Sequence, residues 1–323
     1  MFRASRTEAR DAAVSGSMCP MTSASSPDVT CVVDARNKCG EGPLWHAAEQ
    51  AIYWTDINGF TVQRYRPADG DVQTWQFGEP ACALSLTNEP GRLLLALGSQ
   101  VILWTPATDA RDVLARPEPD TPAHRLNDGA TDPAGQFWVG SMPNNVAPDG
   151  SAQAYGGFTG SLFRVAADGS ATTWDRAFGI YNTAVWSPDG RTFYGGDSVA
   201  NVLYAYDYDV ATQSIANRRD LLRAYDRGAP DGSAMDVEGY LWNCRFGGGC
   251  IVRVSPAGAI DRVIEMPVSN ITNCDFGGPD MQTLYITTAA LETGEGESPL
   301  AGGLFAVRPG VAGLATNQFG VAS

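Results

Sequence analysis

The sequence contains a single lysine, Lys38, and only two histidines, His46 and His124, among 323 residues. Its formal net charge is −14, and a surface of this sign repels phosphate backbones, so we expect no nucleic-acid partner. Two histidines are too few for a three-histidine zinc site and leave few candidates for a serine–histidine triad. The G-x-S-x-G, H-E-x-x-H and phosphate-loop patterns are absent as well.

Long apolar runs and metal-type cysteine spacing are also missing. The seven cysteines are an odd number without a CxxC pair, which is typical of unpaired thiols in a reducing compartment. Residues 1–27 are rich in Ser, Ala and Arg and contain no segment suited to a signal-peptide core or a membrane span. We therefore expect a disordered tail over residues 1–27, a single domain over residues 28–323, a cytoplasmic location and no membrane partner.

The sequence does contain a turn followed by a strand-like run, repeated six times. The turns centre on Glu49, Gly91, Gly135, Gly190, Gly239 and Met281. Their spacing of 42 to 55 residues is close to the roughly 40–50 residues that a four-stranded propeller blade occupies. Residues 29–33 form an unassigned strand that would complete the last blade. The pattern predicts an all-β, six-bladed β-propeller with four antiparallel strands per blade, closed by an N-terminal strand.

An oxygen-bearing side chain stands eight residues before five of the six turn centres. The positions at this offset are Glu41, Ala83, Asn127, Asn182, Asp231 and Asn273. In a radial stack of equivalent units they would point to one shared axis, where their oxygens could surround a hard cation such as Ca²⁺, Mg²⁺ or Mn²⁺. The alternative is that Asn and Asp cap the backbone at turn entries. A constant offset in five units favours the shared site.

Two further features bear on ligand binding. The long insertions at residues 141–160 and 289–303 should lie at the same end of the propeller as these positions, either as a rim for a ligand or as tolerated surface loops. The segment Arg125-Leu-Asn-Asp-Gly129 offers planar donors and an amide, a pair suited to the hydroxyls and carbonyl of a small polar ligand. The alternative for Arg125 is an ion pair with a surface carboxylate.

Taken in order along the chain, these motifs resemble the gluconolactonase and regucalcin-like sugar-lactone hydrolases. The matching segments are Gly40-Glu-Gly-Pro43, Arg125-x-Asn-Asp-Gly129, Asp132-x-x-Gly135, Gly140-x-Met142, Ser187-Pro-Asp-Gly190, Pro230-Asp-Gly232, Phe276-Gly-Gly278 and Ala301-Gly-Gly303. The resemblance implies one divalent metal ion on the axis, with Ca²⁺, Zn²⁺, Mg²⁺, Mn²⁺ and Fe(II) all left open. It implies the metal ligands Glu41, Asn182 and Asp231. It also implies Asp231 as the catalytic general base, with Arg125 and Asn127 as substrate contacts.

Three departures from the family pattern concern the choice of sugar. Thr183 stands where relatives commonly have glycine, and it is expected to narrow the floor of the site. His124 stands where asparagine commonly precedes the motif arginine, and it is expected to alter hydroxyl recognition. Asn145 replaces an acidic side chain that some relatives aim at the substrate. We therefore add Asn145 to the candidate substrate-binding residues.

The resemblance implies an enzyme that hydrolyses an aldonolactone to the aldonic acid. The metal would act as a Lewis acid on the lactone carbonyl, and Asp231 would deprotonate the attacking water. Two alternatives stay open, namely a calcium-dependent phosphotriesterase and a calcium- or sugar-binding propeller without turnover. The expected partner is a small sugar lactone, and the chain is expected to be a monomer or a weak homo-oligomer.

Overall fold

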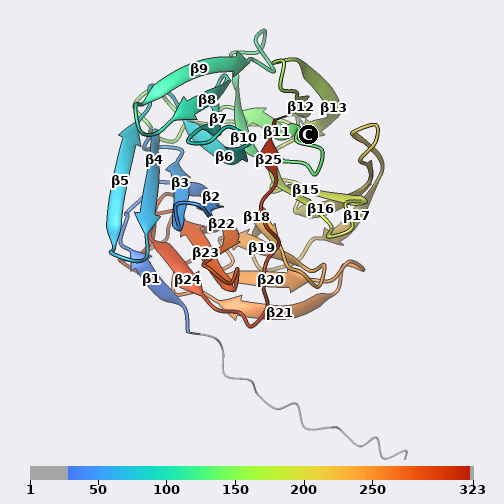
Figure 1. The fold of residues 1–323 in the computed structure, drawn as a ribbon. Helices are drawn as coiled ribbons and strands as arrows, with labels where there is room; N and C mark the ends of the chain where they lie inside the picture. Colours follow the sequence, from blue (N-terminus) through green and yellow to red (C-terminus); the bar gives the residue numbers. More distant parts are fainter. Residues whose placement is uncertain (1–27, 321–323) are drawn as a thin grey trace, which may run out of the picture.

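The computed structural model describes residues 28–320, in which 25 strands form six sheets arranged radially around an axis (Figure 1). The first three blades comprise β2 (Gly40–His46), β3 (Ala51–Asp56), β4 (Thr61–Arg66), β5 (Asp71–Gln76); β6 (Ala81–Thr87), β7 (Leu93–Leu97), β8 (Val101–Thr105), β9 (Ala110–Ala115); and β10 (His124–Thr131), β11 (Phe137–Pro143), β12 (Gly160–Val165), β13 (Ala171–Phe178). The last three comprise β14 (Tyr181–Trp186), β15 (Thr192–Asp197), β16 (Val202–Asp209), β17 (Ser214–Arg223); β18 (Ala229–Met235), β19 (Leu241–Phe246), β20 (Cys250–Val254), β21 (Ile260–Glu265); and β22 (Ile271–Gly277), β23 (Thr283–Thr288), β24 (Leu304–Val307), β1 (Thr30–Val33). The predicted six-bladed β-propeller is confirmed.

The ring is closed by the N-terminal strand, as predicted. Strand β1 pairs antiparallel with β24, with Thr30 opposite Ala306 and Cys31 opposite Phe305. Each innermost strand contacts the innermost strands of both neighbouring blades, including β22 with β2. The first and last blades are therefore joined, and the ring has no open gap between them.

The C-terminal strap, which we define as residues 312–320, adds a strand that the sequence pattern did not predict. Its strand β25 (Gln318–Phe319) pairs parallel with β6, so the second blade has five strands and the prediction of four is wrong for this blade. The strap crosses one face of the ring, where it appears in red in Figure 1. On the way, Leu314 N donates to Met235 O at 3.1 Å and Asn317 Nδ2 donates to Thr131 O at 3.0 Å.

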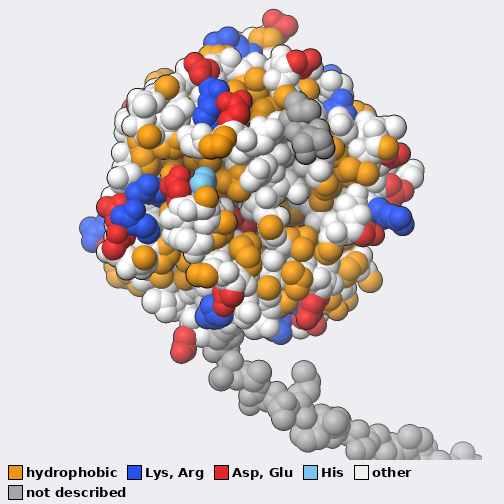
Figure 2. Space-filling view, viewed as in Figure 1, with side chains coloured by type: hydrophobic (Ala, Val, Ile, Leu, Met, Phe, Trp, Pro, Cys, Tyr) orange, Lys and Arg blue, Asp and Glu red, His pale blue; other side chains and the backbone are white. Residues whose placement is uncertain are grey.

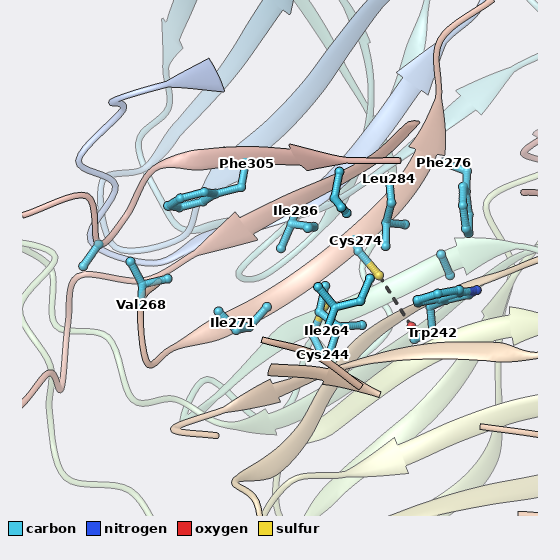
Figure 3. Close-up of a cluster of buried hydrophobic side chains, with 14 residues drawn as sticks. Trp242, Cys244, Ile264, Val268, Ile271, Cys274, Phe276, Leu284, Ile286 and Phe305 are labelled. Atoms are coloured by element: carbon cyan, nitrogen blue, oxygen red, sulfur yellow. Dashed lines mark hydrogen bonds between the residues drawn. The ribbon is translucent and has the colours of Figure 1, made fainter. Parts of the chain in front are cut away.

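The blades pack through apolar side chains that alternate along the strands. Between the fifth and sixth blades, Trp242, Ile271, Phe276 and Phe305 are almost fully buried in one cluster (Figure 3). Burying each such side chain stabilises the fold by roughly 1.5–3 kcal/mol relative to exposure. The blades are therefore rigid supports for the axial side chains.

The turns before the second strand of each blade follow the predicted register closely. Gly135 and Gly239 have φ values of 82° and 84°, the left-handed conformation that glycine adopts without steric cost. Met281 adopts a φ of 54° in the sixth blade, although a side chain there costs roughly 1–2 kcal/mol. In the first blade the left-handed residue is Gln50, one position after the predicted centre Glu49.

Three other predictions concern features outside the sheets. The six described cysteines are all unpaired thiols, as expected. Within residues 28–320 there is no helix long and apolar enough to cross a membrane. The predicted disordered tail, residues 1–27, lies outside the described residues.

Candidate active site

In every blade, the pairing between the innermost strand and the second strand is irregular. The irregularity lies at the same level along the propeller axis in each blade. These shifts fall at Glu41/Leu44, Ala81/Ala83, Leu126/Gly129, Asn182/Ala184, Pro230/Ser233 and Ile271/Asn273. A β-bulge inserts a residue into one strand and redirects the adjacent side chains. Each bulge coincides with or adjoins a position of the eight-residue register, which explains why these positions converge.

A pocket of about 230 Å³ opens on four of the register positions, Glu41, Asn127, Asn182 and Asp231. All six predicted site residues line it, namely Glu41, Arg125, Asn127, Asn145, Asn182 and Asp231. The two insertions also contribute, the first through Tyr155 and the second through Leu291 and Glu292. The prediction that both insertions lie at the end of the site is therefore confirmed. We call this end of the axis the upper end.

Two buried carboxyl groups form the centre of the pocket. Glu41 and Asp231 are each 6% exposed. Burial, with repulsion from Asp128, raises the pKa of Glu41 to about 7. Burial and the charges of Glu41 and Asp128 raise the pKa of Asp231 well above its usual range. The two carboxyl groups also interact directly, and this interaction contributes to the raised pKa of Asp231. Such a pair is stabilised either by a proton or by a cation.

The third predicted ligand, Asn182, is held in a fixed orientation. Its Nδ2 donates to Ser198 Oγ at 2.8 Å, and its Oδ1 accepts from Asn127 Nδ2 at 3.0 Å. An amide oxygen has two lone pairs, so Asn182 Oδ1 keeps one for a cation. Two carboxylates with a neutral oxygen fit a hard divalent ion. The described residues contain no group of three His, Cys, Asp or Glu side chains suited to a metal, so the amide is needed to complete the set.

One wall of the pocket is a chain of hydrogen bonds that begins at Arg125. Its guanidinium donates through Nε to Asn145 Oδ1 at 2.9 Å and through Nη1 to Asn127 Oδ1 at 2.6 Å. Arg125 is only 6% exposed, and it forms no ion pair with a carboxylate of the described residues. The alternative of a surface ion pair is therefore wrong. The three side chains instead form a rigid row of donors and acceptors beside the carboxyl pair.

Two residues have roles that the sequence did not reveal. Asn273 was expected to offer an oxygen to the shell, but its Nδ2 donates to Glu41 Oε2 at 3.0 Å and its Oδ1 accepts from Cys274 N. Asp128 was part of the arginine motif but had no assigned role. Its two oxygens accept from the backbone N–H groups of Gly129 and Thr183 at 2.9 and 2.7 Å. The amide nitrogen of Asn273 is therefore committed to Glu41, and Glu41, Asn182 and Asp231 stay the predicted metal ligands.

Thr183 and His124, the two other residues that depart from the family pattern, lie beside the pocket and do not line it. Thr183 is fully buried with a φ of 64°, and its Oγ1 donates to the carbonyl oxygen of Asp231 at 2.7 Å. It therefore holds the strand at Asp231 instead of narrowing the floor of the pocket. His124 Nε2 lies 2.9 Å from Thr159 Oγ1, at the base of the first insertion.

The fold and this arrangement define a six-bladed β-propeller with one oxygen-lined pocket on its axis. Residues 39–290 match the family model described as the SMP-30/Gluconolactonase/LRE-like region. The chain belongs to this family.

Individual relatives agree with the assignment. The chain is 33% identical to "Regucalcin" of Xenopus laevis over 301 residues, which is 91% of this chain and 99% of the relative. It is 35% identical to "6-deoxy-6-sulfogluconolactonase" of Pseudomonas putida over 295 residues, which is 90% of this chain and 97% of the relative. Among solved structures, the calcium-binding protein regucalcin of Agrobacterium tumefaciens superposes with a TM-score of 0.84 at 26% identity, covering 91% of this chain and 98% of the other.

Proposed function

We propose that this protein is a metal-dependent lactonase that hydrolyses a sugar lactone to the aldonic acid. The observation that carries the proposal is the buried pair Glu41 and Asp231 beside the oriented Asn182, in the same pocket as Arg125 and Asn127. A pair of buried carboxyl groups without a basic partner requires a positive charge to remain ionised. We infer that Glu41, Asn182 and Asp231 hold one divalent ion.

A divalent ion bound there would supply Lewis acidity toward the lactone carbonyl. Asp231 would accept a proton from the attacking water. The pKa of Asp231 is raised, mainly by burial and then by the charge of Glu41. The charge of a bound divalent ion would counteract this shift and keep Asp231 ionised, as a proton acceptor must be.

The wall of Arg125, Asn127 and Asn145 would orient the substrate. Arg125 and Asn127 are held by each other, so few rotamers must be frozen when a ligand binds. Their donors would hold the ring hydroxyls or the ester oxygen of the lactone, and Asn145 would contact the adjoining hydroxyls. Fixing the ring relative to Asp231 lowers the entropic part of the barrier.

The names of the relatives support both parts of the proposal. One relative is named as a lactonase that acts on a modified gluconolactone, and the structural neighbour is described as a calcium-binding protein. A small sugar lactone as substrate and a hard divalent ion as cofactor are consistent with the donor set of this pocket.

The test is proton release from a panel of pentono- and hexonolactones, measured above the spontaneous rate. Metal-stripped protein would be assayed first, and then single divalent ions would be added back. We expect one ion to restore rapid hydrolysis of one or a few aldonolactones. Measurable metal binding without acceleration on any lactone would contradict the proposal and favour a binding protein without turnover.

A further inference from the structure

The mouth of the pocket carries an exposed aromatic surface. Aromatic residues make up 10% of the chain, yet the large exposed aromatics of the described residues are Tyr155 at 44% and Phe158 at 50%, both in the first insertion. Tyr155 also lines the pocket. An aromatic ring at the entrance of a polar pocket is suited to pack against the C–H face of a sugar ring.

A carboxylate from the second insertion faces the same entrance. Glu292 lines the pocket together with Tyr155. Burial raises the pKa of Tyr155, and the nearby charge of Glu292 raises it further. The two side chains therefore lie within electrostatic range of each other, although 137 positions separate them in the sequence. The entrance thus combines an apolar ring with a hydrogen-bond acceptor of negative charge.

The pocket offers little positive charge to balance an anionic substituent. Of the residues that line it, Arg125 is the basic one, and its guanidinium already donates to Asn145, Asn127 and the carbonyl oxygen of Leu126. The single lysine, Lys38, is not part of the lining and lies beside the turn at Gly150. The formal net charge of −14 adds a long-range field that disfavours the approach of anions.

We propose that Tyr155 and Glu292 form a distal subsite that selects lactones with a neutral, hydroxyl-bearing tail and rejects lactones whose tail carries a phosphate or sulfonate. Tyr155 supports the carbon face of the substrate, and Glu292 accepts hydrogen bonds from the tail hydroxyls. An anionic tail meets Glu292 with the same sign of charge, and such a juxtaposition is strongly unfavourable. This inference rests on the proposed lactonase function and specifies its substrate class.

The test compares kcat/KM for D-glucono-1,5-lactone and for its 6-phosphate in the metal-loaded protein. We expect the wild type to prefer the neutral lactone, and Glu292→Gln to raise kcat/KM for the phosphate about tenfold relative to kcat/KM for the neutral lactone. The gain should shrink in high salt, because salt screens exposed charges. Glu295→Gln is the matched control, since Glu295 lies in the same insertion but lines a different hollow.

Tyr155→Ala and Tyr155→Phe separate the two parts of the subsite. The alanine variant should raise KM for the neutral lactone about tenfold with kcat nearly unchanged, and the phenylalanine variant should retain the wild-type KM, because the ring face provides the contact. An unchanged ratio of neutral to anionic substrate in Glu292→Gln, or an equal change in Glu295→Gln, would overturn the proposal.

Failure of the lactonase function itself would be distinguishable. If no lactone is hydrolysed, calorimetric binding of gluconate and 6-phosphogluconate would replace turnover as the readout. Preferential binding of gluconate that is lost in Glu292→Gln supports the subsite. Equal binding of both ligands by the wild type overturns it.

Discussion

The two ends of the propeller axis are built from the same six innermost strands but differ in chemistry. At the upper end, two insertions frame a pocket of about 230 Å³ that contains Glu41 and Asp231. At the lower end, the C-terminal strap borders a larger cavity of about 490 Å³. Figure 2 views this lower face and shows a hollow among hydrophobic side chains. The larger cavity is not the better candidate site.

The lower cavity contains carboxyl groups whose oxygens are bound by the backbone. Asp128 accepts from Gly129 N and Thr183 N, and Asp275 accepts from Trp45 N at 2.9 Å. The residues around them are largely apolar or small, including Leu44, Leu84 and Leu314. At the upper end Glu41 also accepts a backbone N–H, from Gly42, but it lies beside a second buried carboxyl group, Asp231. What distinguishes the site is therefore the pair of carboxyl groups beside the Arg125 and Asn182 side chains, rather than the volume of the cavity.

The largest expected effect is on turnover, where a substitution at the upper end and a substitution at the lower end should change kcat very differently. Asp231→Asn keeps the size of the side chain and an oxygen, but removes the proton acceptor, so we expect kcat to fall by about 10²–10⁴. Asp275→Asn at the lower end should leave kcat within about threefold of the wild type. Steady-state kinetics on the best lactone would measure both. Near-normal turnover by Asp231→Asn with metal bound would rule out the base role.

The second-largest expected effect is a loss of stability on changing a residue of the C-terminal strap at the lower end. Phe319 of the strap is 3% exposed and packs against the second and third blades. Phe319→Ala should lower the free energy of unfolding by about 3–5 kcal/mol, because it removes a buried ring and leaves a cavity. Urea unfolding would measure the loss, and kcat of the folded fraction should not change. A large loss of kcat at full stability would show that the strap acts on the site.

The pH dependence of stability should reveal the upper carboxyl pair. The pKa of Glu41 is raised from 4.5 to about 7, chiefly by burial, so the folded state binds the proton more tightly than the unfolded state. The stability contributed by this group is full below pH 4.5 and is lost as the pH rises through about 7. Metal-stripped protein should therefore lose about 3 kcal/mol from this group between pH 4.5 and pH 8.

A divalent ion should recover that loss at pH 8 and stabilise the protein much less at pH 5. Urea unfolding at the two pH values, with and without the ion, would measure the difference. Glu41→Gln is the control, since it removes the titrating group and should abolish the contribution of this residue. An ion effect of equal size at both pH values would contradict the assignment.

The smallest expected effect concerns a hydrogen bond in the lower cavity. Ser85 Oγ lies 2.6 Å from Thr131 Oγ1, and both side chains are buried. Ser85→Ala should lower the free energy of unfolding by about 1–2 kcal/mol, since it leaves the Thr131 hydroxyl with one partner fewer. The KM and kcat for the lactone should stay unchanged. A shift in KM would mean that the lower cavity communicates with the substrate pocket.

Much of the fold could be predicted because the turns and strands repeat at a regular spacing. The eight-residue offset also identified the side chains that meet on the axis, since every blade places its bulge at the same level. The strap was missed because β25 has only two residues and carries no periodic pattern. Its path depends on tertiary fit, as at Gly313, where an added Cβ would lie 2.1 Å from Phe276.

The orientations of polar groups within the site could not be predicted from the sequence. Asn182 and Asn273 occupy equivalent register positions, but the amide nitrogen of Asn182 donates to Ser198 while that of Asn273 donates to Glu41. The difference depends on the neighbours of each amide, because Ser198 of the same blade binds the amide nitrogen of Asn182, whereas Asn273 meets Glu41 of the first blade. Likewise, Tyr155 and Glu292 meet only because two insertions from different blades reach the same mouth.

The most direct test of the account is a crystal structure of the protein soaked with Mn²⁺, in which anomalous scattering locates the ion. We predict one Mn²⁺ ion per chain at the upper end, bound by Glu41, Asn182 and Asp231. An ion in the lower cavity beside Asp275, or no bound ion at concentrations that support hydrolysis, would contradict the account.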